Sequence, residues 1–357
     1  MVNKGRVMVA MSGGVDSSVA ACLLKSQGYD VVGVTMKLWS DDRTDTLGRS
    51  RGCCTIDDVE DARRVCQIIG APHYVMSFQD EFRAHVIDYF ISEYRRGRTP
   101  HPCLACNDKI KFDFLMKRAN ALDVEYVATG HYARLDASCG RPRLLRGVDP
   151  LKDQSYVLFG LRPHQMRHLL LPVGGFDKSE IRDIARDAGL PVADKPDSQE
   201  ICFIPDNDYR AFLAERFAPT PGEIVDTEGN LVGTHQGIER FTVGQRRGLG
   251  IHSRKPLFVL SLDRAENRVV VGPAEGLLRS TLLADGVNYL SGEAPNGPTE
   301  VEAKIRYKSE AAPAVLTPRG EQAELRFREP QRAITPGQAV VFYRGDEVLG
   351  GGYIEGD

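Results

Sequence analysis

The sequence predicts an α/β protein with a parallel sheet at its N-terminus, a small mixed central domain and a C-terminal β-barrel. Short apolar runs alternate with helix-length segments over roughly the first 200 residues, which is typical of a parallel sheet with helices on both faces. Short β-like runs broken by Gly and Pro appear after about residue 205. Apolar and polar residues then alternate with a period of two from about residue 278. We therefore expect domains over residues 1–205, 206–276 and 277–357.

Four strands and four helices are expected in the N-terminal domain. Short apolar runs predict the strands at Arg6–Ala10, Val31–Leu38, Tyr74–Phe78 and Tyr126–Thr129. The longer segments between them predict helices at Val15–Gln27, Asp57–Ile69, Phe82–Tyr94 and Lys109–Ala121. Gly28 and Gly70 follow the first two helices, as expected at helix C-termini. In a sheet of this kind the ligand binds at the carboxyl ends of the strands.

The second half of the chain reads as β-structure. In the central domain, short apolar runs at Gly222–Val225, Phe258–Leu260 and Val269–Val271 predict strands. In the C-terminal domain, alternation predicts strands at Val301–Tyr307 and Ala323–Arg328, and a hairpin that joins Ala339–Tyr343 to Val348–Ile354.

Composition excludes several classes of protein. The 357 residues are 42% hydrophobic and 27% charged, which are ordinary values for a globular protein. The formal net charge of -3 excludes a histone-like polycation, so contacts with nucleic acid must come from local basic patches. No apolar run approaches the ~18 residues of a membrane span, and no cleavage signal opens the chain. We expect a cytoplasmic protein that does not bind membranes, whose 8 cysteines do not form a disulfide scaffold.

A glycine-containing loop follows the first expected strand and opens the first helix. Its sequence, Ala10-Met11-Ser12-Gly13-Gly14-Val15-Asp16-Ser17-Ser18, lets the backbone approach a ligand closely and brings successive N–H groups to a helix N-terminus. The serines add hydroxyl donors, and Asp16 is a candidate ligand of a Mg²⁺ ion that bridges phosphates. The chain contains no Gly-Lys dipeptide, so this is not a Walker A loop. The loop predicts a phosphate-binding site.

The loop resembles that of the pyrophosphate-loop ATPases, which have the adenine nucleotide alpha-hydrolase-like fold. The resemblance implies that ATP is cleaved between its α and β phosphates and that AMP is attached to a carbonyl-type oxygen. Met36 lies at the end of the second expected strand and Gly130 follows the fourth, and adenine and ribose would lie at these strand ends. The expected nucleotide contacts are therefore Ala10, Met11, Ser12, Gly13, Gly14, Val15, Asp16, Ser17, Met36 and Gly130.

Three cysteines are candidates for chemistry. Cys103 and Cys106 form a Cys-x-x-Cys pair, which is typical of a redox pair, half of a zinc site or part of an iron–sulfur site. Asn107 is a good N-cap for the expected helix, and a helix N-terminus next to Cys106 favours its thiolate. Cys202 lies in a loop-like stretch among apolar residues. We interpret Cys22 and Cys66 as core residues and leave Cys53 and Cys54 unassigned.

Taken together, the motifs resemble those of the bacterial tRNA-specific 2-thiouridylases. Besides the loop, they are Gly52-Cys53-Cys54-Thr55, Cys106-Asn107 with Ile110-Lys111-Phe112, Ala128-Thr129-Gly130-His131-Tyr132-Ala133-Arg134, Lys152-Asp153-Gln154-Ser155-Tyr156, Ile201-Cys202-Phe203-Ile204 and Phe241-Thr242-Val243-Gly244-Gln245-Arg246-Arg247-Gly248-Leu249. The resemblance covers nearly the whole chain. It implies an adenylating domain, a central domain and a β-barrel, and a reaction in which the wobble uridine of tRNA exchanges its C2 oxygen for sulfur.

The resemblance also implies roles for the cysteines. The residue that matches Cys202 carries a persulfide received from a sulfur-donor protein, and the residue that matches Cys106 is its partner in catalysis. Many family members have Asp where this chain has Cys103. Three thiolates, from Cys103, Cys106 and Cys202, are enough to hold a [4Fe–4S] cluster with one open iron. The sequence leaves three alternatives open: a persulfide or disulfide cycle, a cluster, and a zinc site.

A basic stretch and scattered residues predict contact with RNA. Residues 240–255 include Arg246, Arg247 and Arg254, several glycines and no acidic residue after Arg240. The resemblance implies further contacts with tRNA from His101, Pro102, Cys103, His131, Lys152, Asp153, Gln154, Arg306, Tyr307 and Gln338, of which the first three would lie beside an extruded target base. Two rival functions are a pyrophosphate-loop ligase for a small metabolite and a non-enzymatic, cysteine-based redox or metal sensor.

Overall fold

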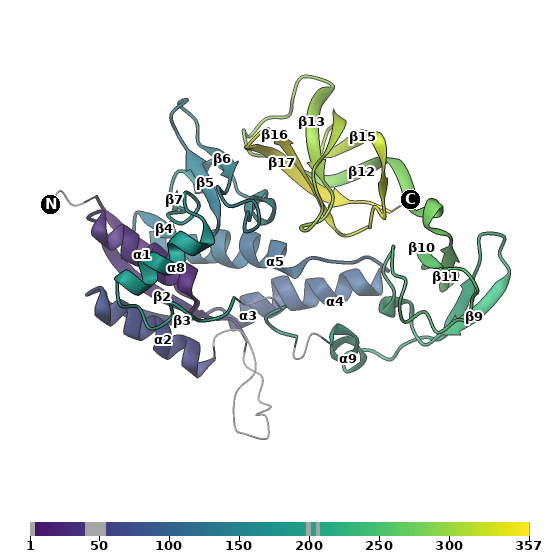
Figure 1. Cartoon of the computed structure of the whole chain (residues 1–357), viewed down its shortest axis with the longest axis horizontal. Helices are drawn as coiled ribbons and strands as arrows, with labels where there is room; N and C mark the ends of the chain where they lie inside the picture. The colour runs from purple at the N-terminus through teal and green to yellow at the C-terminus, as the bar shows by residue number, and fades with distance from the viewer. Residues whose placement is uncertain (1–3, 40–54, 198–200, 205–207, 357) are drawn as a thin grey trace.

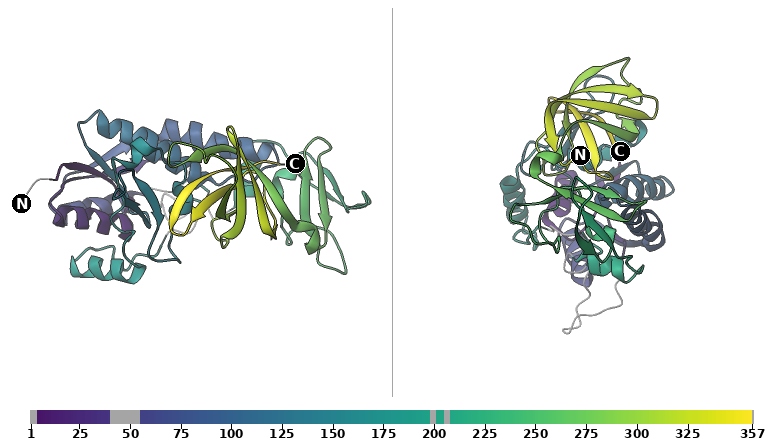
Figure 2. Two further views of the ribbon diagram at one scale, coloured as in Figure 1. Left: turned by 90° about the horizontal axis from the view of Figure 1, so that it is seen from above. Right: turned by 90° about the vertical axis from the view of Figure 1, so that its right-hand side faces the viewer.

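The computed structural model describes residues 4–39, 55–197, 201–204 and 208–356. An N-terminal α/β domain, a small central β-domain and a C-terminal β-barrel follow one another along the chain (Figure 1). The barrel lies over two long helices of the N-terminal domain, and the central domain lies at the far end of these helices. Seen from above, the N-terminal and central domains form opposite ends of an elongated molecule (Figure 2). The predicted fold class is confirmed.

The N-terminal sheet has five parallel strands in the order β3-β2-β1-β4-β7. Their bounds are β1 Arg6–Ala10, β2 Asp30–Lys37, β3 His73–Ser77, β4 Tyr126–Ala128 and β7 Leu169–Leu170. The strand order reverses direction between β1 and β4, and such a switch point is where ligands bind in sheets of this kind. The loop after β1 and the residue Gly130 after β4 therefore meet at the expected ligand position.

Helices cover both faces of this sheet. Val7 and Val9 of β1 belong to one core with α1 (Val15–Ser26), α2 (Ile56–Ile68) and α8 (Lys178–Asp187). Met8 and Ala10 belong to a second core with the two long helices. Successive side chains of a strand point to opposite faces, so this alternation produces a three-layer domain.

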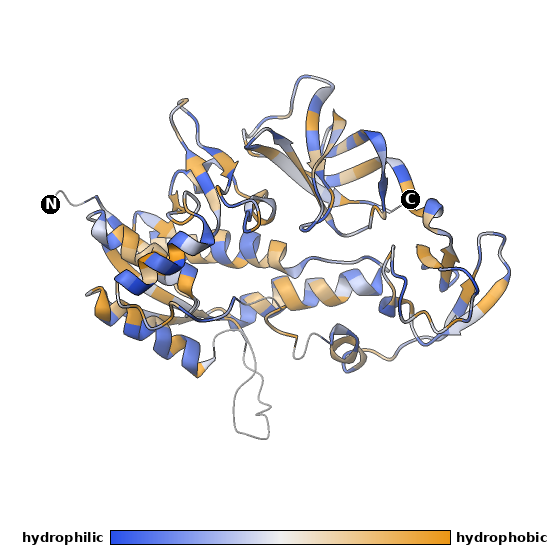
Figure 3. Ribbon diagram, viewed as in Figure 1, coloured by the Kyte–Doolittle hydropathy of each residue, from blue (hydrophilic) through white to orange (hydrophobic). Residues whose placement is uncertain are grey.

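The second layer consists of two long helices, each with a π-helical middle. The first comprises α3 (Gln79–Phe82), the π-helical Arg83–Ile87 and α4 (Asp88–Arg95). The second comprises α5 (Pro102–Ala105), the π-helical Cys106–Leu115 and α6 (Met116–Asn120). Apolar and polar residues alternate along both, as burial of one side requires (Figure 3).

The start of the second long helix differs from the prediction. The helix begins at Pro102, after an extended His101, and not at Lys109. Proline fits the first helical position because it lacks an N–H group and has a helical φ angle. Asn107 is therefore not an N-cap. It is buried within the helix, and its side-chain amide donates a hydrogen bond of 3.0 Å to the Val157 carbonyl.

The C-terminal domain is a closed antiparallel barrel in which the strands follow the order β12-β15-β14-β13-β16-β17, and β12 also pairs with β17. The bounds are β12 Leu278–Tyr289, β13 Thr299–Lys304, β14 Ala312–Arg319, β15 Gln322–Arg332, β16 Ala339–Arg344 and β17 Glu347–Ile354. A hairpin of β5 (Ala133–Asp136) and β6 (Arg143–Arg146), which the sequence analysis missed, joins β17 through the pair Leu145 and Glu347. The N-terminal domain thus contributes two strands to the barrel sheet.

The central domain is a four-stranded sheet in the order β10-β11-β8-β9. Its elements are α9 Tyr209–Ala214, β8 Gly222–Val225, β9 Leu231–His235, β10 Phe258–Asp263 and β11 Arg268–Gly272. The remaining short helices are α7 Pro163–Met166 and 3₁₀ turns at Ser155–Leu158, Ile238–Arg240 and Ala274–Leu277. No helix in the described ranges is both long and apolar enough to cross a membrane.

Candidate functional site

The loop between β1 and α1 presents backbone N–H groups at the sheet's switch point. Helix α1 begins at Val15 after Gly14, and within the described residues no side chain caps its first N–H groups. The Ser17 hydroxyl instead accepts a 3.2 Å hydrogen bond from the Ser12 N–H and lies 3.2 Å from the Gly14 carbonyl, to which it donates. Unsatisfied N–H groups at a helix N-terminus are a binding site for an anion.

Close packing fixes the position of this loop. Gly130 follows β4 and packs against the first turn of α1, where a Cβ atom would lie 2.6 Å from the Ser17 nitrogen. The Lys195 ammonium donates to the Gly13 carbonyl at 3.0 Å, and also to Asp58 and Asp61 of α2 at 2.8 and 2.7 Å. The loop is therefore preorganised by backbone contact and by a lysine that the sequence analysis did not single out.

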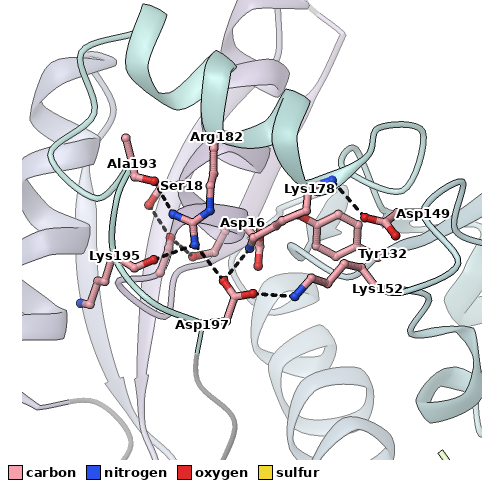
Figure 4. Close-up of polar contacts among 12 residues, drawn as sticks. Asp16, Ser18, Tyr132, Asp149, Lys152, Lys178, Arg182, Ala193, Lys195 and Asp197 are labelled. Atoms are coloured by element: carbon pink, nitrogen blue, oxygen red, sulfur yellow. Dashed lines mark hydrogen bonds and ion pairs between the residues drawn. The ribbon is translucent and has the colours of Figure 1, made fainter. Parts of the chain in front are cut away.

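Asp16 is held from two directions. Its Oδ1 accepts hydrogen bonds of 2.7 Å from the Tyr132 hydroxyl and of 2.7 Å from the Lys178 ammonium (Figure 4). The Lys178 side chain is only 12% exposed, so a buried positive charge lies at the edge of the loop. Burial, followed by the hydrogen bond to Asp16, raises the pKa of Tyr132, which stays protonated as a donor. Asp16 is the expected Mg²⁺ ligand, and Lys178 would have to share or release it when the ion arrives with ATP.

Asp197 joins three cations behind the loop. Its carboxylate lies 2.8 Å from Lys152, 2.9 Å from Lys178 and 3.2 Å from Arg182 (Figure 4). Burial alone would raise the pKa of Asp197, but the hydrogen bonds from Lys152 and Lys178 outweigh it and lower the pKa to about 2. The network gathers Lys152 and Lys178 next to the phosphate loop with a carboxylate that is ionised at neutral pH.

The candidate catalytic cysteines pack against one apolar core. Cys106 and Cys202 are half-buried against the core beneath the two long helices, whereas Cys103 is exposed. The ring of Phe203 anchors the Cys202 segment, since its centroid lies 5.7 Å from that of Phe82 and 5.4 Å from that of Phe90. The two cysteines, 96 residues apart in sequence, thus pack against one core that extends from the N-terminal sheet to the barrel.

The cysteines do not fit a metal centre as they are placed. Among the residues that the structure describes, no three His, Cys, Asp or Glu side chains are grouped so that they could hold a metal ion. Cys103 is exposed, unlike the other two. The predicted ligand set of Cys103, Cys106 and Cys202 is therefore not assembled in this arrangement. Cys53 and Cys54 lie outside the described residues.

Three aromatic side chains meet where the second long helix begins below the barrel. The ring of Tyr307 lies 6.3 Å from that of His101 and 5.9 Å from that of Tyr156, between ring centroids. Burial lowers the pKa of His101, and its buried Nδ1 has no hydrogen-bond partner among the described groups. The exposed Cys103 is close enough to Tyr307 to raise the pKa of its hydroxyl, after burial and Asp153. This junction thus gathers aromatic rings around an imidazole whose lowered pKa favours the neutral form.

The second long helix, residues 102–120, carries Cys103 and Cys106 and is called the cysteine helix. The short segment before it, Arg98 and Thr99, is called the strap, and it is bound to both other domains. The Thr99 N–H donates to the Pro336 carbonyl at 2.9 Å, and the Gln338 amide donates to the Thr99 carbonyl at 2.8 Å. The Thr99 hydroxyl also contacts that of Thr242 in the central domain at 3.2 Å. All three domains therefore meet at one residue.

An ion-pair chain continues from this strap to the end of the barrel. Arg98 lies 2.8 Å from the buried Glu93 and 2.8 Å from Glu355, which follows β17. The Arg98 side chain is only 20% exposed, so two carboxylates neutralise a largely buried cation. The position of His101 and Cys103 thus depends on contacts made by the C-terminal end of the barrel.

Comparisons with known proteins cover every domain. The sequence models of three domain families match: the tRNA methyl transferase HUP domain over residues 5–206, the tRNA methyl transferase PRC-barrel domain over residues 210–273 and the aminomethyltransferase beta-barrel domain over residues 279–354. The tRNA-specific 2-thiouridylase MnmA of Heliobacterium modesticaldum is 54% identical over 358 residues, which is 98% of this chain and 92% of that protein. The protein of the same name from Carboxydothermus hydrogenoformans is 51% identical, and that from Clostridium perfringens 49%, each over 99% of both chains.

This chain belongs to the tRNA-specific 2-thiouridylase family. The match to this family spans all three domains of this thiouridylase. It therefore includes the phosphate loop, the cysteines and the barrel together, which excludes a chance combination of separate motifs.

Several residues predicted to bind the nucleotide are buried in this thiouridylase. Ala10, Met11, Val15 and Met36 belong to the apolar cores on either side of the sheet. With these side chains packed in the cores, a ligand can contact only the backbone groups of the four residues. Ser12, Asp16 and Ser17 keep polar side chains at the loop. The roles of all ten residues in nucleotide binding stay predictions.

The residues predicted to contact tRNA fall into separate groups. His101, Pro102, Cys103, Tyr307, Arg306 and Gln338 lie at the domain junction, whereas Lys152 lies in the Asp197 network. The exposed side chains of Arg246, Arg247 and Arg254 lie on the central domain.

Three of the predicted tRNA contacts have internal partners. His131 is buried, with Nδ1 2.7 Å from the Thr129 hydroxyl, and burial holds its pKa well below the ordinary value. Asp153 is buried and accepts hydrogen bonds from the N–H groups of Gly147 and Ser155. The Gln154 side-chain oxygen accepts from the N–H of the residue after His131 at 2.9 Å. These contacts give the three residues structural roles, and their contact with tRNA stays a prediction.

Proposed function

We propose that this chain replaces the C2 oxygen of the wobble uridine of tRNA with sulfur, in a reaction that converts ATP to AMP and pyrophosphate. The observation that carries the proposal is the full-length relationship to 2-thiouridylases, in a chain that retains the Ser-Gly-Gly loop with Cys106 and Cys202. A ligase for a small metabolite needs neither the cysteine pair nor the barrel, so the relationship disfavours that rival.

ATP solves the problem of a poor leaving group. The C2 carbonyl of uracil is urea-like, and its oxygen leaves easily only after AMP is attached to it. The N–H groups at the start of α1 would hold the departing pyrophosphate, and Ser12 and Ser17 would add hydroxyl donors. Lys178 and Lys152 would stabilise the negative charge next to the loop, and Asp16 would hold a Mg²⁺ ion that offsets the charge of the phosphates.

The sulfur would come from cysteine. A sulfur-donor protein would load Cys202 as a persulfide, whose outer sulfur bonds to C2 while the bond from C2 to the AMP oxygen breaks. Cys106 would attack the inner sulfur of Cys202, either to free sulfide before that step or to free the thiolated base after it. Both routes leave a disulfide between Cys106 and Cys202, which a thiol reductant must reopen.

The RNA would reach the site with its target base extruded. Tyr307 and His101 offer stacking surfaces beside Cys103, and the basic loop of the central domain offers charges for the phosphates. The junction of the three domains would thereby hold the base while the anticodon stem lies along the barrel and the central domain.

The test separates the two half-reactions in a single turnover with ATP and unmodified tRNA. We expect Cys202→Ala to form pyrophosphate and adenylated tRNA but no 2-thiouridine, because adenylation uses no cysteine. Cys106→Ala should also release pyrophosphate and form no 2-thiouridine, with the tRNA held either as the adenylate or in a disulfide with Cys202. Cys103→Ser, the matched control, should thiolate at a rate within about threefold of wild type, since Cys103 is exposed and takes no part in these steps. Full thiolation by Cys202→Ala, or pyrophosphate release that does not depend on tRNA, would overturn the proposal.

A further inference from the structure

Lys304 is a half-buried cation that pairs with no carboxylate among the described residues. It ends β13 below the barrel, and its ammonium lies 5.9 Å from the ring centroid of Tyr156 and 5.7 Å from that of Tyr307. No group in the described part of the chain accepts a hydrogen bond from it or forms an ion pair with it. A lysine in such a place loses hydration, and the attraction of two ring faces compensates only part of that loss.

The nearest carboxylate does not compensate this charge. Burial and the positive charge of Arg146 lower the pKa of Lys304, and Asp153 opposes them only in part. Asp153 is already bonded to the N–H groups of Gly147 and Ser155 and to the Ser155 hydroxyl, each at 3.0 Å. It cannot turn toward Lys304 without leaving those buried donors unsatisfied.

Two further cations lie on the same edge of the barrel. Arg306 is half-buried and donates to the Arg332 carbonyl at 2.9 Å, and burial and the charge of Arg332 lower its pKa. The guanidinium of Arg332 is exposed and lies 4.8 Å from the ring centroid of Phe258. Neither arginine forms an ion pair with any described residue. Like charges gathered without carboxylates repel one another, and an anionic ligand would relieve that repulsion.

We propose that Lys304 binds a phosphodiester of the RNA next to the nucleotide stacked on Tyr307, and that Arg306 and Arg332 extend this phosphate site along the barrel edge. The proposal rests on the proposed function, since it uses RNA as the ligand. A nucleotide supplies both groups that the junction can recognise. Its planar base can stack on the rings of His101 and Tyr307, and its phosphate can bind the Lys304 ammonium next to the Tyr307 ring.

The phosphates of ATP are the other source of the same chemistry, and the experiment distinguishes the two. Affinities for a synthetic anticodon stem–loop and for ATP are measured separately, for wild type, Lys304→Met and Lys304→Arg. The matched control is Lys117→Met, because Lys117 also lies over a ring, that of Phe114 at 5.4 Å, but is exposed on α6. We expect Lys304→Met to weaken stem–loop binding about tenfold and to reduce the salt slope by about one, with ATP affinity unchanged. Lys304→Arg, which keeps the charge, should restore most of the loss, and Lys117→Met should match wild type.

Neutral methylphosphonates placed one at a time in the stem–loop locate the phosphate. At one position near the target uridine, the substitution should weaken wild type about tenfold and leave the affinity of Lys304→Met unchanged, because the two changes remove the same contact. Three outcomes would overturn the proposal. The first is that every methylphosphonate weakens Lys304→Met by the same factor as wild type. The others are that Lys304→Met binds the stem–loop as tightly as wild type, or that it loses affinity only for ATP. Formation of 2-thiouridine is scored separately, so a chain that binds RNA through Lys304 but does not thiolate it would contradict only the proposed function.

Discussion

Asp197 is the residue on which the polar groups around the phosphate loop converge. Burial would raise its pKa, but Lys152 and Lys178 lower it from the ordinary 3.8 to about 2. A carboxyl group whose pKa is lower in the folded state stabilises that state above its unfolded pKa, and the contribution is lost as the pH falls toward 2. The shift in pKa corresponds to a stabilisation of about 2 kcal/mol, and solvent reduces this value because the side chain is a quarter exposed. We therefore expect Asp197→Asn to reduce the free energy of unfolding at pH 7 by about 1 to 2 kcal/mol.

The pH dependence is what identifies this charge effect. Urea unfolding of wild type and Asp197→Asn at pH 7 and pH 3 should show a difference that shrinks at the lower pH. At pH 3 the unfolded state, with the ordinary pKa of 3.8, has taken up a proton at Asp197, whereas the folded state has not. Asp183→Asn is the matched control, because Asp183 is an exposed partner of Arg186 on α8 and should have little effect at either pH. A difference between Asp197→Asn and wild type that is equal at both pH values would contradict the explanation.

Sequence pattern predicts residues of this site only where they are neighbours in the chain. The loop from Ser12 to Ser17 is a contiguous motif after a strand, so its place at the switch point could be predicted. Lys178 reaches Asp16 across 162 residues, and only the fold brings them together. Asp197 lies five residues before Cys202 in the sequence, but nothing in that segment indicates that Lys152 and Lys178 are its charge partners.

Among the elements, the cysteine helix shows how a correct local signal can be misplaced. Asn is a good N-cap, and Pro is a good first residue of a helix, so two starting points competed. Pro102 is the residue that starts the helix, and Asn107 is buried with its amide bonded to Val157. Cys106 therefore lies in the second turn, where the helix N-terminus affects its thiolate less than the sequence suggested.

A substitution at Asn107 tests this placement. We expect Asn107→Ala to lower the free energy of unfolding by about 1 to 3 kcal/mol, because a buried carbonyl loses its donor. Asn120→Ala at the exposed end of the same helix should have an effect of less than about 0.5 kcal/mol. Urea unfolding of both variants gives the measurement, and equal effects would indicate that Asn107 acts only through helix propensity.

The hairpin of β5 and β6 marks a second limit of sequence reasoning at this scale. The segment from Ala133 to Arg146 alternates only briefly and contains charged residues, so no periodic signal separates it from a loop. It becomes β-structure because β6 pairs with β17, more than 200 residues away in sequence. The barrel strands themselves were predictable, since one face of each is buried and their apolar residues recur with a period of two.

Across the whole molecule, the three domains are joined at the residues that precede the cysteine helix. Thr99 is bonded to the barrel at Pro336 and Gln338 and contacts Thr242 of the central domain. Gly337, with a φ of +87°, permits this approach, because a Cβ there would lie 2.9 Å from the Thr99 nitrogen. The barrel is thus part of the framework that places the cysteine helix, in addition to any contact it makes with RNA.

The Arg98–Glu355 pair tests whether that framework matters for the reaction. Glu355→Ala leaves Glu93 as the only carboxylate that pairs with Arg98 among the described residues, and it removes the ion pair between the end of β17 and the strap. We expect the single-turnover rate of thiolation to fall about tenfold while affinity for tRNA changes less than about twofold, because small displacements of reacting groups slow a reaction more than they weaken binding. Asp346→Ala is the matched control, since it removes an exposed ion pair, that with Arg134, which also joins the N-terminal domain to the barrel. If both variants lose the same fraction of activity, or if Glu355→Ala loses tRNA affinity in proportion to rate, the barrel acts on binding and not on the position of the cysteines.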